Sequence, residues 1–151
     1  MPTLPCTRND APTLGVEVEL QLVDAQTYKL RSAIADVLDR LPPDLEHCVK
    51  PELMQCYLEI NTGVCKTVGE VRRDLQQTLR KLYAITDAID IRLFWGATHP
   101  VSSWRRQEVT VTERYYRLVE LMQDIARRLV TYGLHVHVGV ESGDKAVMVC
   151  D

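Results

Sequence analysis

Three short stretches of the sequence place acidic or imidazole side chains on every second residue or between apolar neighbours. Glu17 and Glu19 alternate with valine and leucine in "TLGVEVELQLVD", and His135 and His137 alternate with valine in "GLHVHVGV". A third stretch, "YLEIN", carries Glu59. In an extended strand, residues two apart point to the same side. Each stretch therefore predicts a strand with one apolar face and one face that carries carboxylates or imidazoles.

If these strands belong to one antiparallel sheet, their polar side chains gather on a single face. Carboxylates held close together repel one another, and each loses hydration when it is buried. Carboxylate oxygens are preferred ligands of Mg²⁺ and Mn²⁺, and Mn²⁺ also accepts imidazole. The pattern indicates a face that binds divalent metal ions. A sheet with one face exposed to water explains any single stretch better, and it is the occurrence of all three stretches that favours a metal-binding face; both interpretations remain open at this point.

Glu52 is a further candidate for the same face. It lies seven positions before Glu59, so one regular strand would place the two carboxylates on opposite faces. A bulge or turn around residues 53–55 would bring Glu52 back to the side of Glu59. The sequence leaves these two arrangements open.

The elements that must position these residues follow from periodicity and capping signals. Thr67 and Glu70 form a capping box that predicts a helix of about twenty residues. Thr110 and Glu113 predict a second helix, and Gly133 is its candidate C-cap. The expected buried stripe of this second helix is Leu118, Met122, Ile125 and Leu129. Strands are expected over residues 14–23, 45–51, 53–61, from residue 91 onward and over 134–141, with a short helix capped by Ser32.

Composition restricts the class of protein. The chain has 151 residues, of which 46% are hydrophobic and 26% charged, which is typical of one globular domain. We expect residues 1–12 to form a flexible lead-in. No apolar run approaches the ~20 residues of a bilayer span. The five cysteines include no C-x-x-C pair, which favours a reducing, cytoplasmic location.

The net charge of −3 argues against nucleic acid as a partner, because such proteins normally carry a basic surface. The short cluster Trp104-Arg105-Arg106 is basic and aromatic, and it is interpreted as a solvated loop.

Five stretches resemble, in the same order, the carboxylate–amine ligases of the type-2 glutamate–cysteine ligase family. They are "TLGVEVELQLVD", "MQCYLEINTGV", "WGATHPVSSWRRQEVT", "ERYYRLVELMQDIARR" and "GLHVHVGV". The most specific parts are "THP...W...Q" and "HVHVG" after a helix that contains Arg-Tyr. The resemblance covers nearly all of residues 13–150.

The resemblance implies an α+β fold of the glutamine synthetase and guanido kinase type. In that fold an antiparallel sheet forms one wall of a funnel, and helices pack on its outer face. Members of the family are longer than this chain, so residues 13–151 are expected to be the N-terminal part of a single catalytic domain. The missing part would supply more strands, another acidic ligand and phosphate-binding arginines. The isolated chain is therefore expected to have low or no activity.

The implied reaction is ATP-dependent amide-bond formation through an acyl phosphate, as in the glutamate–cysteine ligase step of glutathione biosynthesis. ATP, glutamate and an amine such as cysteine are the expected small-molecule partners, Mg²⁺ or Mn²⁺ is the expected cofactor, and a homo-oligomer is an open option. Two alternatives remain: a non-catalytic Mg-nucleotide binding or interaction module, and a divalent-metal hydrolase.

Metal ligands carry over from the family by position. Glu17 and Glu19 are implied to bind different metal ions from one strand. Glu52 and Glu59 are implied to complete the ion that faces the amino-acid substrate, and His135 the ion near the nucleotide phosphates. The family usually has one more glutamate at the position of Val18, and alternation predicts that this position faces away from the metals.

Two further residues are implied to act on the substrates. His137 would contact phosphate or substrate, and Arg114 would hold a carboxylate or phosphate, since a guanidinium forms paired hydrogen bonds with such groups. A helix-surface charge is an equally open interpretation of Arg114. Thr98 and His99 begin a loop near the mouth of the funnel, and His99 is expected to stabilise that loop.

Overall fold

A computed structural model describes residues 9–150; residues 1–8 of the expected lead-in lie outside the described residues. The strands are β1 (Thr13–Asp24), β2 (Val49–Pro51), β3 (Tyr57–Asn61), β4 (Ile91–Phe94) and β5 (Leu134–Gly139). The helices are α1 (Ile34–Leu38), α2 (Val68–Asp87), α3 (Glu113–Met122), α4 (Asp124–Arg127) and α5 (Gly143–Cys150), and Trp104–Arg106 forms a 3₁₀ turn.

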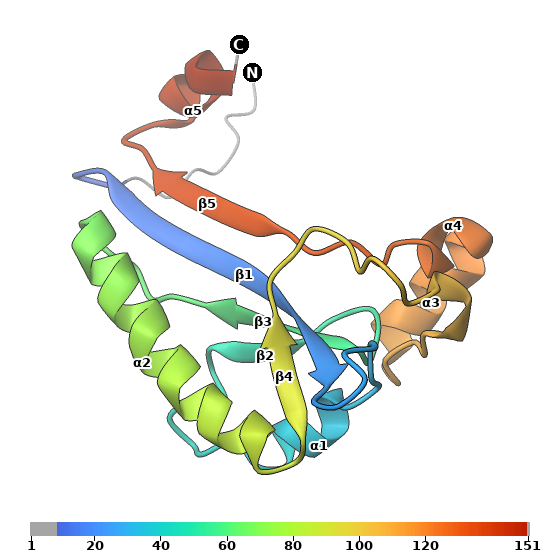
Figure 1. The fold of residues 1–151 in the computed structure, drawn as a ribbon. Helices are drawn as coiled ribbons and strands as arrows, with labels where there is room; N and C mark the ends of the chain where they lie inside the picture. The colour runs from blue at the N-terminus through green and yellow to red at the C-terminus, as the bar shows by residue number, and fades with distance from the viewer. Residues whose placement is uncertain (1–8, 151) are drawn as a thin grey trace.

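Strand β1 is the centre of an antiparallel sheet (Figure 1). Along one edge it pairs with β3, which pairs in turn with β2. Along its other edge it pairs with β5 over residues 13–18 and with β4 over residues 21–24. The predicted α+β class with an antiparallel sheet is confirmed, and one long strand connects all of its parts.

Alternation along β1 separates a buried apolar face from a polar face, as predicted. The apolar side chains of β1 pack in one core with residues of α1 and α2. Members of this core include Val16, Val18, Leu20, Leu22, Val37, Val71 and Leu82. Val18 is 4% exposed and faces away from Glu17 and Glu19, so a valine there removes nothing from the polar face.

Helix α2 begins with the predicted capping box. The Thr67 side chain accepts a hydrogen bond from the Glu70 amide at 3.2 Å, and the Glu70 carboxylate accepts one from the Lys66 amide at 2.6 Å. The first bond satisfies a backbone donor that the first turn of a helix leaves free, and the second holds the residue before the cap, where a standard capping box would bond the amide of the cap residue itself. The helix then runs for 20 residues and covers the apolar face of the sheet (Figure 1).

The predicted second helix is wrong in its start and its continuity. Thr112, not Thr110, caps α3 by accepting a hydrogen bond from the Tyr115 amide at 3.3 Å. Gln123 adopts a φ of 50°, which ends α3 and redirects α4. Because the chain turns there, residues after Gln123 no longer share a face with those before it. Ile125 is consequently 64% exposed, while Ala126 is buried.

Three smaller expectations are also wrong. Ser32 does not cap α1, because the carbonyl of Gln55 accepts from the amides of Ala33 and Ile34 instead. The segments 45–51 and 53–61 are strands only near their ends, and a turn over residues 52–56 connects β2 to β3.

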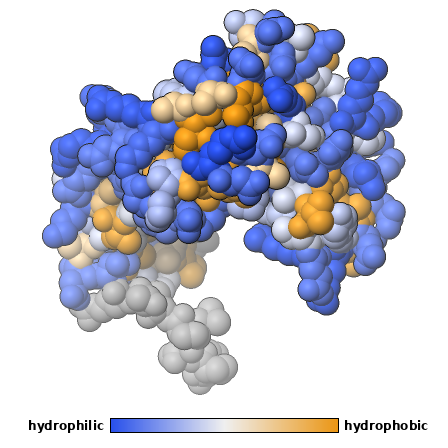
Figure 2. Space-filling model, turned by 90° about the horizontal axis from the view of Figure 1, so that it is seen from below, coloured by the Kyte–Doolittle hydropathy of each residue, from blue (hydrophilic) through white to orange (hydrophobic). Residues whose placement is uncertain are grey.

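Apolar side chains also reach the surface. Within residues 9–150 no helix covers the apolar side of β5, where Leu134, Val136 and Val138 are 58–64% exposed. A view from below shows a further face that is mostly hydrophilic with a central group of apolar side chains (Figure 2). None of the helices in the described part of the chain combines the length and apolar character that a bilayer span requires.

Replacing Leu20 with alanine tests the role of β1 in the core. Leu20 is fully buried, so Leu20→Ala should lower the free energy of unfolding by about 2–5 kcal/mol through lost burial and the cavity left behind. Urea unfolding measures the change. Val64→Ala is the control, since Val64 is 82% exposed and its change should stay within about 0.5 kcal/mol. Equal losses in both variants would contradict this packing.

Candidate active site

The strand register brings the predicted side chains to one face of the sheet. Glu19 lies opposite Glu59 on β3, and Glu17 lies opposite His135 on β5. His137 lies opposite Gly15. Residues that face each other directly in an antiparallel pair project to the same side. The convergence that the sequence pattern predicted therefore exists, and three strands contribute to it.

Glu17 holds both histidines of β5. One of its oxygens, Oε2, lies 3.2 Å from Nδ1 of His135 and 3.2 Å from Nε2 of His137. These contacts lower the pKa of the Glu17 carboxyl, with the hydrogen bond to His137 the largest cause. A carboxylate only accepts hydrogen bonds, so the contact favours a proton on Nδ1 of His135 and leaves its Nε2 as a free lone pair. Glu17 thus orients the imidazole of His135.

Glu19 and His135 meet at Gly133. The Glu19 carboxylate accepts a hydrogen bond from the Gly133 amide at 2.5 Å. A Cβ at position 133 would lie 3.3 Å from Nε2 of His135 and 3.6 Å from Oε2 of Glu19. The expectation that Gly133 is a helix C-cap is wrong, because no glycine in residues 9–150 has a positive φ. Gly133 instead leaves room between two candidate ligand atoms.

Glu52 reaches the site from the turn between β2 and β3, whereas Glu59 lies within β3. The Glu52 carboxylate lies 3.4 Å from the Tyr115 hydroxyl and 3.3 Å from the Leu53 amide. Burial raises the pKa of the Glu52 carboxyl, and the negative charges of Glu59 and Glu19 raise it further. The turn therefore brings the Glu52 charge within range of the other two carboxylates.

A pocket of about 550 Å³ opens on this face of the sheet. Four of the candidate residues line it: Glu19, Glu52, Arg114 and His135. Thr98 lines the same pocket, as its position in the sequence led us to expect. Arg114 comes from the first turn of α3 and lies with its guanidinium 5.4 Å from the ring centre of Tyr115. Glu17, Glu59 and His137 do not line the pocket.

Glu19 and Glu52 in the pocket and Glu59 beside it lack an ion-pair partner in the described residues, although Arg114 lines the same pocket. In residues 9–150, no lysine or arginine forms an ion pair with Glu19, Glu52 or Glu59. The nearest cation by register is Lys50, opposite Glu59, and its ammonium is bonded to the Glu46 carbonyl. Asn61 donates to Glu59 at 3.0 Å, and its own buried side-chain oxygen has no partner. The face therefore offers oxygen acceptors without matching donors.

The donor set fits a hard divalent cation that keeps part of its water. In the described chain, no three His, Cys, Asp or Glu side chains are close enough to form a complete metal cluster. Mg²⁺ commonly takes only one or two protein carboxylates and fills its other positions with water and phosphate oxygens. Separated carboxylates around an open pocket suit that mode of binding.

Three tyrosines form much of the pocket wall, and the sequence pattern did not identify them. Tyr57, Tyr115 and Tyr132 all line the pocket and are 4–7% exposed. The rings of Tyr57 and Tyr132 meet edge to face at 5.0 Å. Burial raises the pKa of Tyr115 to about 12, so its hydroxyl remains a hydrogen-bond donor at neutral pH. The sequence offered one signal for this wall: Tyr57 and Glu59 are two positions apart and therefore share a face of the strand.

His99 stabilises its loop, as expected. Its Nδ1 accepts hydrogen bonds from the amides of Val101 and Ser102 at 3.3 and 3.0 Å. Nε2 lies 2.9 Å from the carbonyl of Tyr28, which fixes the proton on Nε2. Because both ring nitrogens are occupied, His99 anchors the loop that carries Thr98 to the pocket.

Gln21 supports the same loop from the sheet. Its side chain is fully buried and donates a hydrogen bond to the Gly96 carbonyl at 2.8 Å. The carbonyl of the next residue, Ala97, accepts from the Tyr132 amide at 3.0 Å. These bonds hold Gly96 and Ala97 in place beside the pocket.

Comparison with known proteins gives one family. Residues 13–151 match the model of the family described as glutamate–cysteine ligase family 2. A Thermobifida fusca protein with the provisional name glutamate–cysteine ligase 2 is 44% identical over 145 residues, covering 91% of this chain and 35% of that protein. A Gloeobacter violaceus protein of the same provisional name is 42% identical over 149 residues, covering 97% of this chain and 40% of that protein.

Solved structures share the fold at lower sequence identity. A glutamate–cysteine ligase from Francisella tularensis in complex with AMP aligns with a TM-score of 0.64 and 13% identity, covering 95% of this chain and 30% of that one. A bifunctional glutathione synthetase from Pasteurella multocida aligns with a TM-score of 0.57 and 17% identity, covering 93% and 18%. The chain thus spans well under half the length of these proteins and of the two relatives above.

Replacing Glu52 with glutamine tests whether the negative charge of this half-buried carboxyl lowers the free energy of unfolding. A raised pKa means that the charged form of Glu52 disfavours folding, so stability should fall as pH rises from the ordinary glutamate pKa toward the raised one. In metal-free buffer at neutral pH, Glu52→Gln should raise the urea midpoint and remove this part of the pH dependence. Glu46→Gln, at an exposed site, is the control and should change neither. A lower midpoint for Glu52→Gln would show that the carboxylate stabilises the fold.

Proposed function

Because this chain belongs to glutamate–cysteine ligase family 2, we propose that the whole protein is an ATP-dependent ligase joining a carboxylate to an amine. The carboxylate is that of glutamate, and cysteine is the first candidate for the amine. Residues 13–151 form the N-terminal part of the catalytic domain in this proposal. The rest of the protein corresponds to the length that the relatives have beyond the matched region.

One observation carries the proposal: Glu19 of β1 and Glu52 of the turn after β2 line one pocket beside Glu59 of β3, and none of the three forms an ion pair with a lysine or arginine of the described residues. Burial raises the pKa of the Glu52 carboxyl most, and the negative charges of Glu59 and Glu19 raise it further. A protein that keeps such an arrangement gains from it only when a positive ligand is present. Mg²⁺ or Mn²⁺ bound there would neutralise the charge of ATP phosphates during phosphoryl transfer.

The side chains have distinct roles in this proposal. Glu19 and Nε2 of His135 face each other across Gly133 and would hold a cation at the pocket. Glu17 would be a ligand on the neighbouring site or would act by orienting His135, which it contacts at 3.2 Å. Ligand histidines commonly have such a carboxylate behind them.

The substrate side of the pocket would be formed by the remaining candidates. Glu52 and Glu59 would face the amino-acid substrate. Arg114 lines the same pocket, and a guanidinium can bind a carboxylate or phosphate through two parallel hydrogen bonds. His137 lies beyond the pocket lining, and Glu17 would hold it toward an incoming phosphate.

The reaction itself needs positioning and charge neutralisation. An oxygen of the substrate carboxylate attacks the γ-phosphorus of ATP, and ADP leaves with the electrons of the broken P–O bond. The amine nitrogen then attacks the carbonyl carbon of the acyl phosphate, inorganic phosphate leaves, and the nitrogen loses a proton. The negative charge of Glu52 and the positive charge of Arg114, both in the pocket lining, would hold an amino acid in one orientation for both steps.

Metal binding by the 151-residue chain tests the site. Mn²⁺ should bind, with higher affinity when ATP is present, and Glu19→Gln should weaken the affinity by about tenfold or more because a carboxylate ligand is lost. Titration followed by electron paramagnetic resonance measures free Mn²⁺ directly. Glu108→Gln, an exposed carboxylate outside the pocket lining, should bind Mn²⁺ as the wild type does. Unchanged affinity in Glu19→Gln would reject the assignment.

Turnover separates a ligase from the two alternatives. The isolated chain should release no ADP, whereas the chain extended by the C-terminal region found in its relatives should release ADP only with glutamate, an amine and Mg²⁺. His135→Ala in the extended protein should lower kcat about 100-fold. Nucleotide binding without turnover in the extended protein would favour a non-catalytic module, and ATP-independent hydrolysis a metal hydrolase. Glutamate-dependent turnover by the isolated chain would contradict the expected division of the site.

A further inference from the structure

A group of cationic side chains lies around Trp104, on segments that are distant in the sequence. Trp104 begins a 3₁₀ turn, and its ring packs at the edge of the cluster that contains Tyr115 and Tyr132. The guanidinium of Arg105 lies 4.5 Å from the ring centre of Trp104, and that of Arg128 lies 5.2 Å from it. One half-buried indole therefore holds two arginines that are separated by 23 positions in the chain.

The break between α3 and α4 produces this arrangement. Gln123 has a φ of 50°, a conformation that residues other than glycine rarely adopt. The break redirects the chain, so that Arg127 and Arg128 come beside the turn of Trp104. A continuous helix would have carried these arginines along the axis of α3. The interpretation of Trp104-Arg105-Arg106 as an isolated solvated loop is therefore incomplete, because the fold adds two more arginines to it.

Two adjoining hollows lie at this cluster. One, of about 260 Å³, is lined by Trp104, Arg105, Gln107, Asp124 and Arg127. The other, of about 570 Å³, shares Arg105 and Gln107 with the first and adds Arg106 and Lys29. Neither hollow shares a lining residue with the carboxylate pocket. The cationic region is thus a separate place on the surface.

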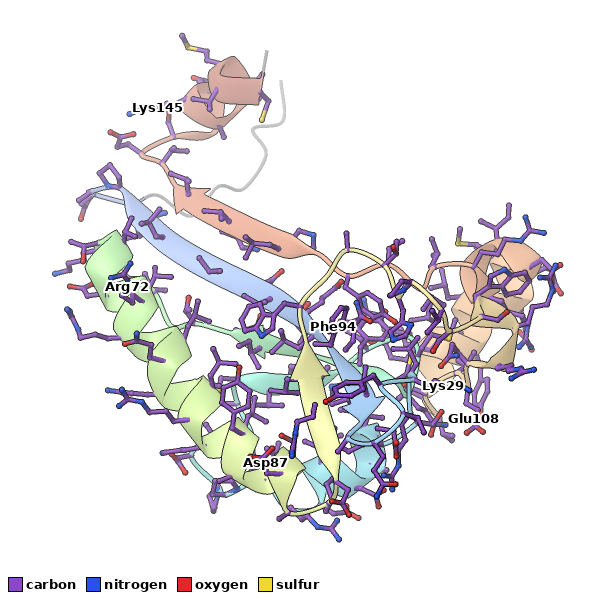
Figure 3. The ribbon with its side chains drawn as sticks, in the orientation of Figure 1. Lys29, Arg72, Asp87, Phe94, Glu108 and Lys145 are labelled. Carbon is purple, nitrogen blue, oxygen red and sulfur yellow. The ribbon has the colours of Figure 1, made fainter. Side chains whose placement is uncertain are left out.

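The cationic side chains of this region form no ion pair with a carboxylate of the described residues. Lys29, Arg105, Arg106, Arg127 and Arg128 form no ion pair within residues 9–150, although arginines elsewhere pair with Asp24, Asp87 and Glu113. Asp124 is the one carboxylate in the lining of the two hollows. Glu108, exposed, appears on the same side of the view as Lys29 (Figure 3). The local balance is positive in a chain whose net charge is −3.

We propose that the hollows around Trp104 bind a small phosphate-bearing anion, independently of any metal ion. Guanidinium groups match phosphate oxygens through paired hydrogen bonds. Stacking on Trp104 fixes Arg105, which lines both hollows, so less side-chain freedom is lost when a ligand binds. Arg128 stacks on the same ring and lines neither hollow. The hollows are the size of a small-molecule site. Their charge is opposite to that of the carboxylate pocket, and their predicted ligand needs no bridging cation.

Inorganic pyrophosphate is the probe, because it has phosphate oxygens and no base or sugar. Titration calorimetry on the 151-residue chain in 0.15 M NaCl with EDTA should show one site with a dissociation constant of about 10–100 µM. EDTA removes divalent ions, so any metal-dependent binding at the carboxylate pocket does not contribute. Glu19→Gln should leave this affinity unchanged.

Two double variants separate a specific site from general attraction. Arg105→Ala with Arg127→Ala, the two arginines that line the smaller hollow, should weaken pyrophosphate binding by about tenfold or more. Arg72→Ala with Arg73→Ala removes the same charge from exposed positions on α2, away from Lys29 in Figure 3, and should bind as the wild type does. Arg105→Lys with Arg127→Lys should also lose affinity, because lysine keeps the charge but not the planar fork.

A local signal is available from tryptophan fluorescence. The chain has two tryptophans, so Trp95→Phe leaves Trp104 as the single emitter, and pyrophosphate should change its emission. The same spectrum without ligand checks that each arginine variant is folded. Three results would overturn the proposal: no binding at millimolar pyrophosphate, equal losses in the Arg72/Arg73 control, or tighter binding of a short RNA through the same arginines, which would indicate a nucleic-acid surface.

Discussion

Like charges held on one face of a sheet are the constraint from which the rest of this structure follows. The apolar side chains of β1 are buried against α1 and α2, so the alternation of the strand obliges Glu17 and Glu19 to project to the other side. Register then brings Glu59 opposite Glu19 and His135 opposite Glu17. The free energy gained by burying the apolar face thus fixes acidic side chains in positions that they would not adopt by themselves.

The protein moderates this repulsion in part of the face and leaves it in another. Two histidines surround Glu17 and lower the pKa of its carboxyl, whereas Glu52 has a raised pKa beside Glu19 and Glu59. Glu17, which the two histidines contact, lies outside the pocket lining, whereas Glu19, Glu52 and Glu59 lie in the pocket or beside it without an ion-pair partner among the described residues. Carboxylates without a basic partner are expected where a site binds a cation. This agrees with the ligase family to which the chain belongs.

The cluster around Trp104 gathers positive charges, whereas the pocket gathers negative ones. Its arginines are held by an aromatic ring and by a backbone break at Gln123, and no carboxylate in the described chain pairs with them. A residue with positive φ that is not glycine costs about 1–3 kcal/mol unless its surroundings compensate. Both charged regions also hold like charges near one another, and binding of an ion of opposite sign would reduce that repulsion.

Local patterns in the sequence determined the cap of α2 and the strands that carry five candidate residues, because alternation and capping depend on near neighbours. These residues are Glu17, Glu19, Glu59, His135 and His137. The order of the five motifs also indicated the family. It did not determine where Glu52 lies, because the hairpin between β2 and β3 is set by contacts across the sheet. It also gave the wrong reason for Gly133, whose small size is needed between Glu19 and His135 rather than at a helix end. Tertiary structure alone decided that three tyrosines wall the pocket and that Arg128 joins Trp104, because contacts between distant segments leave no period in the chain.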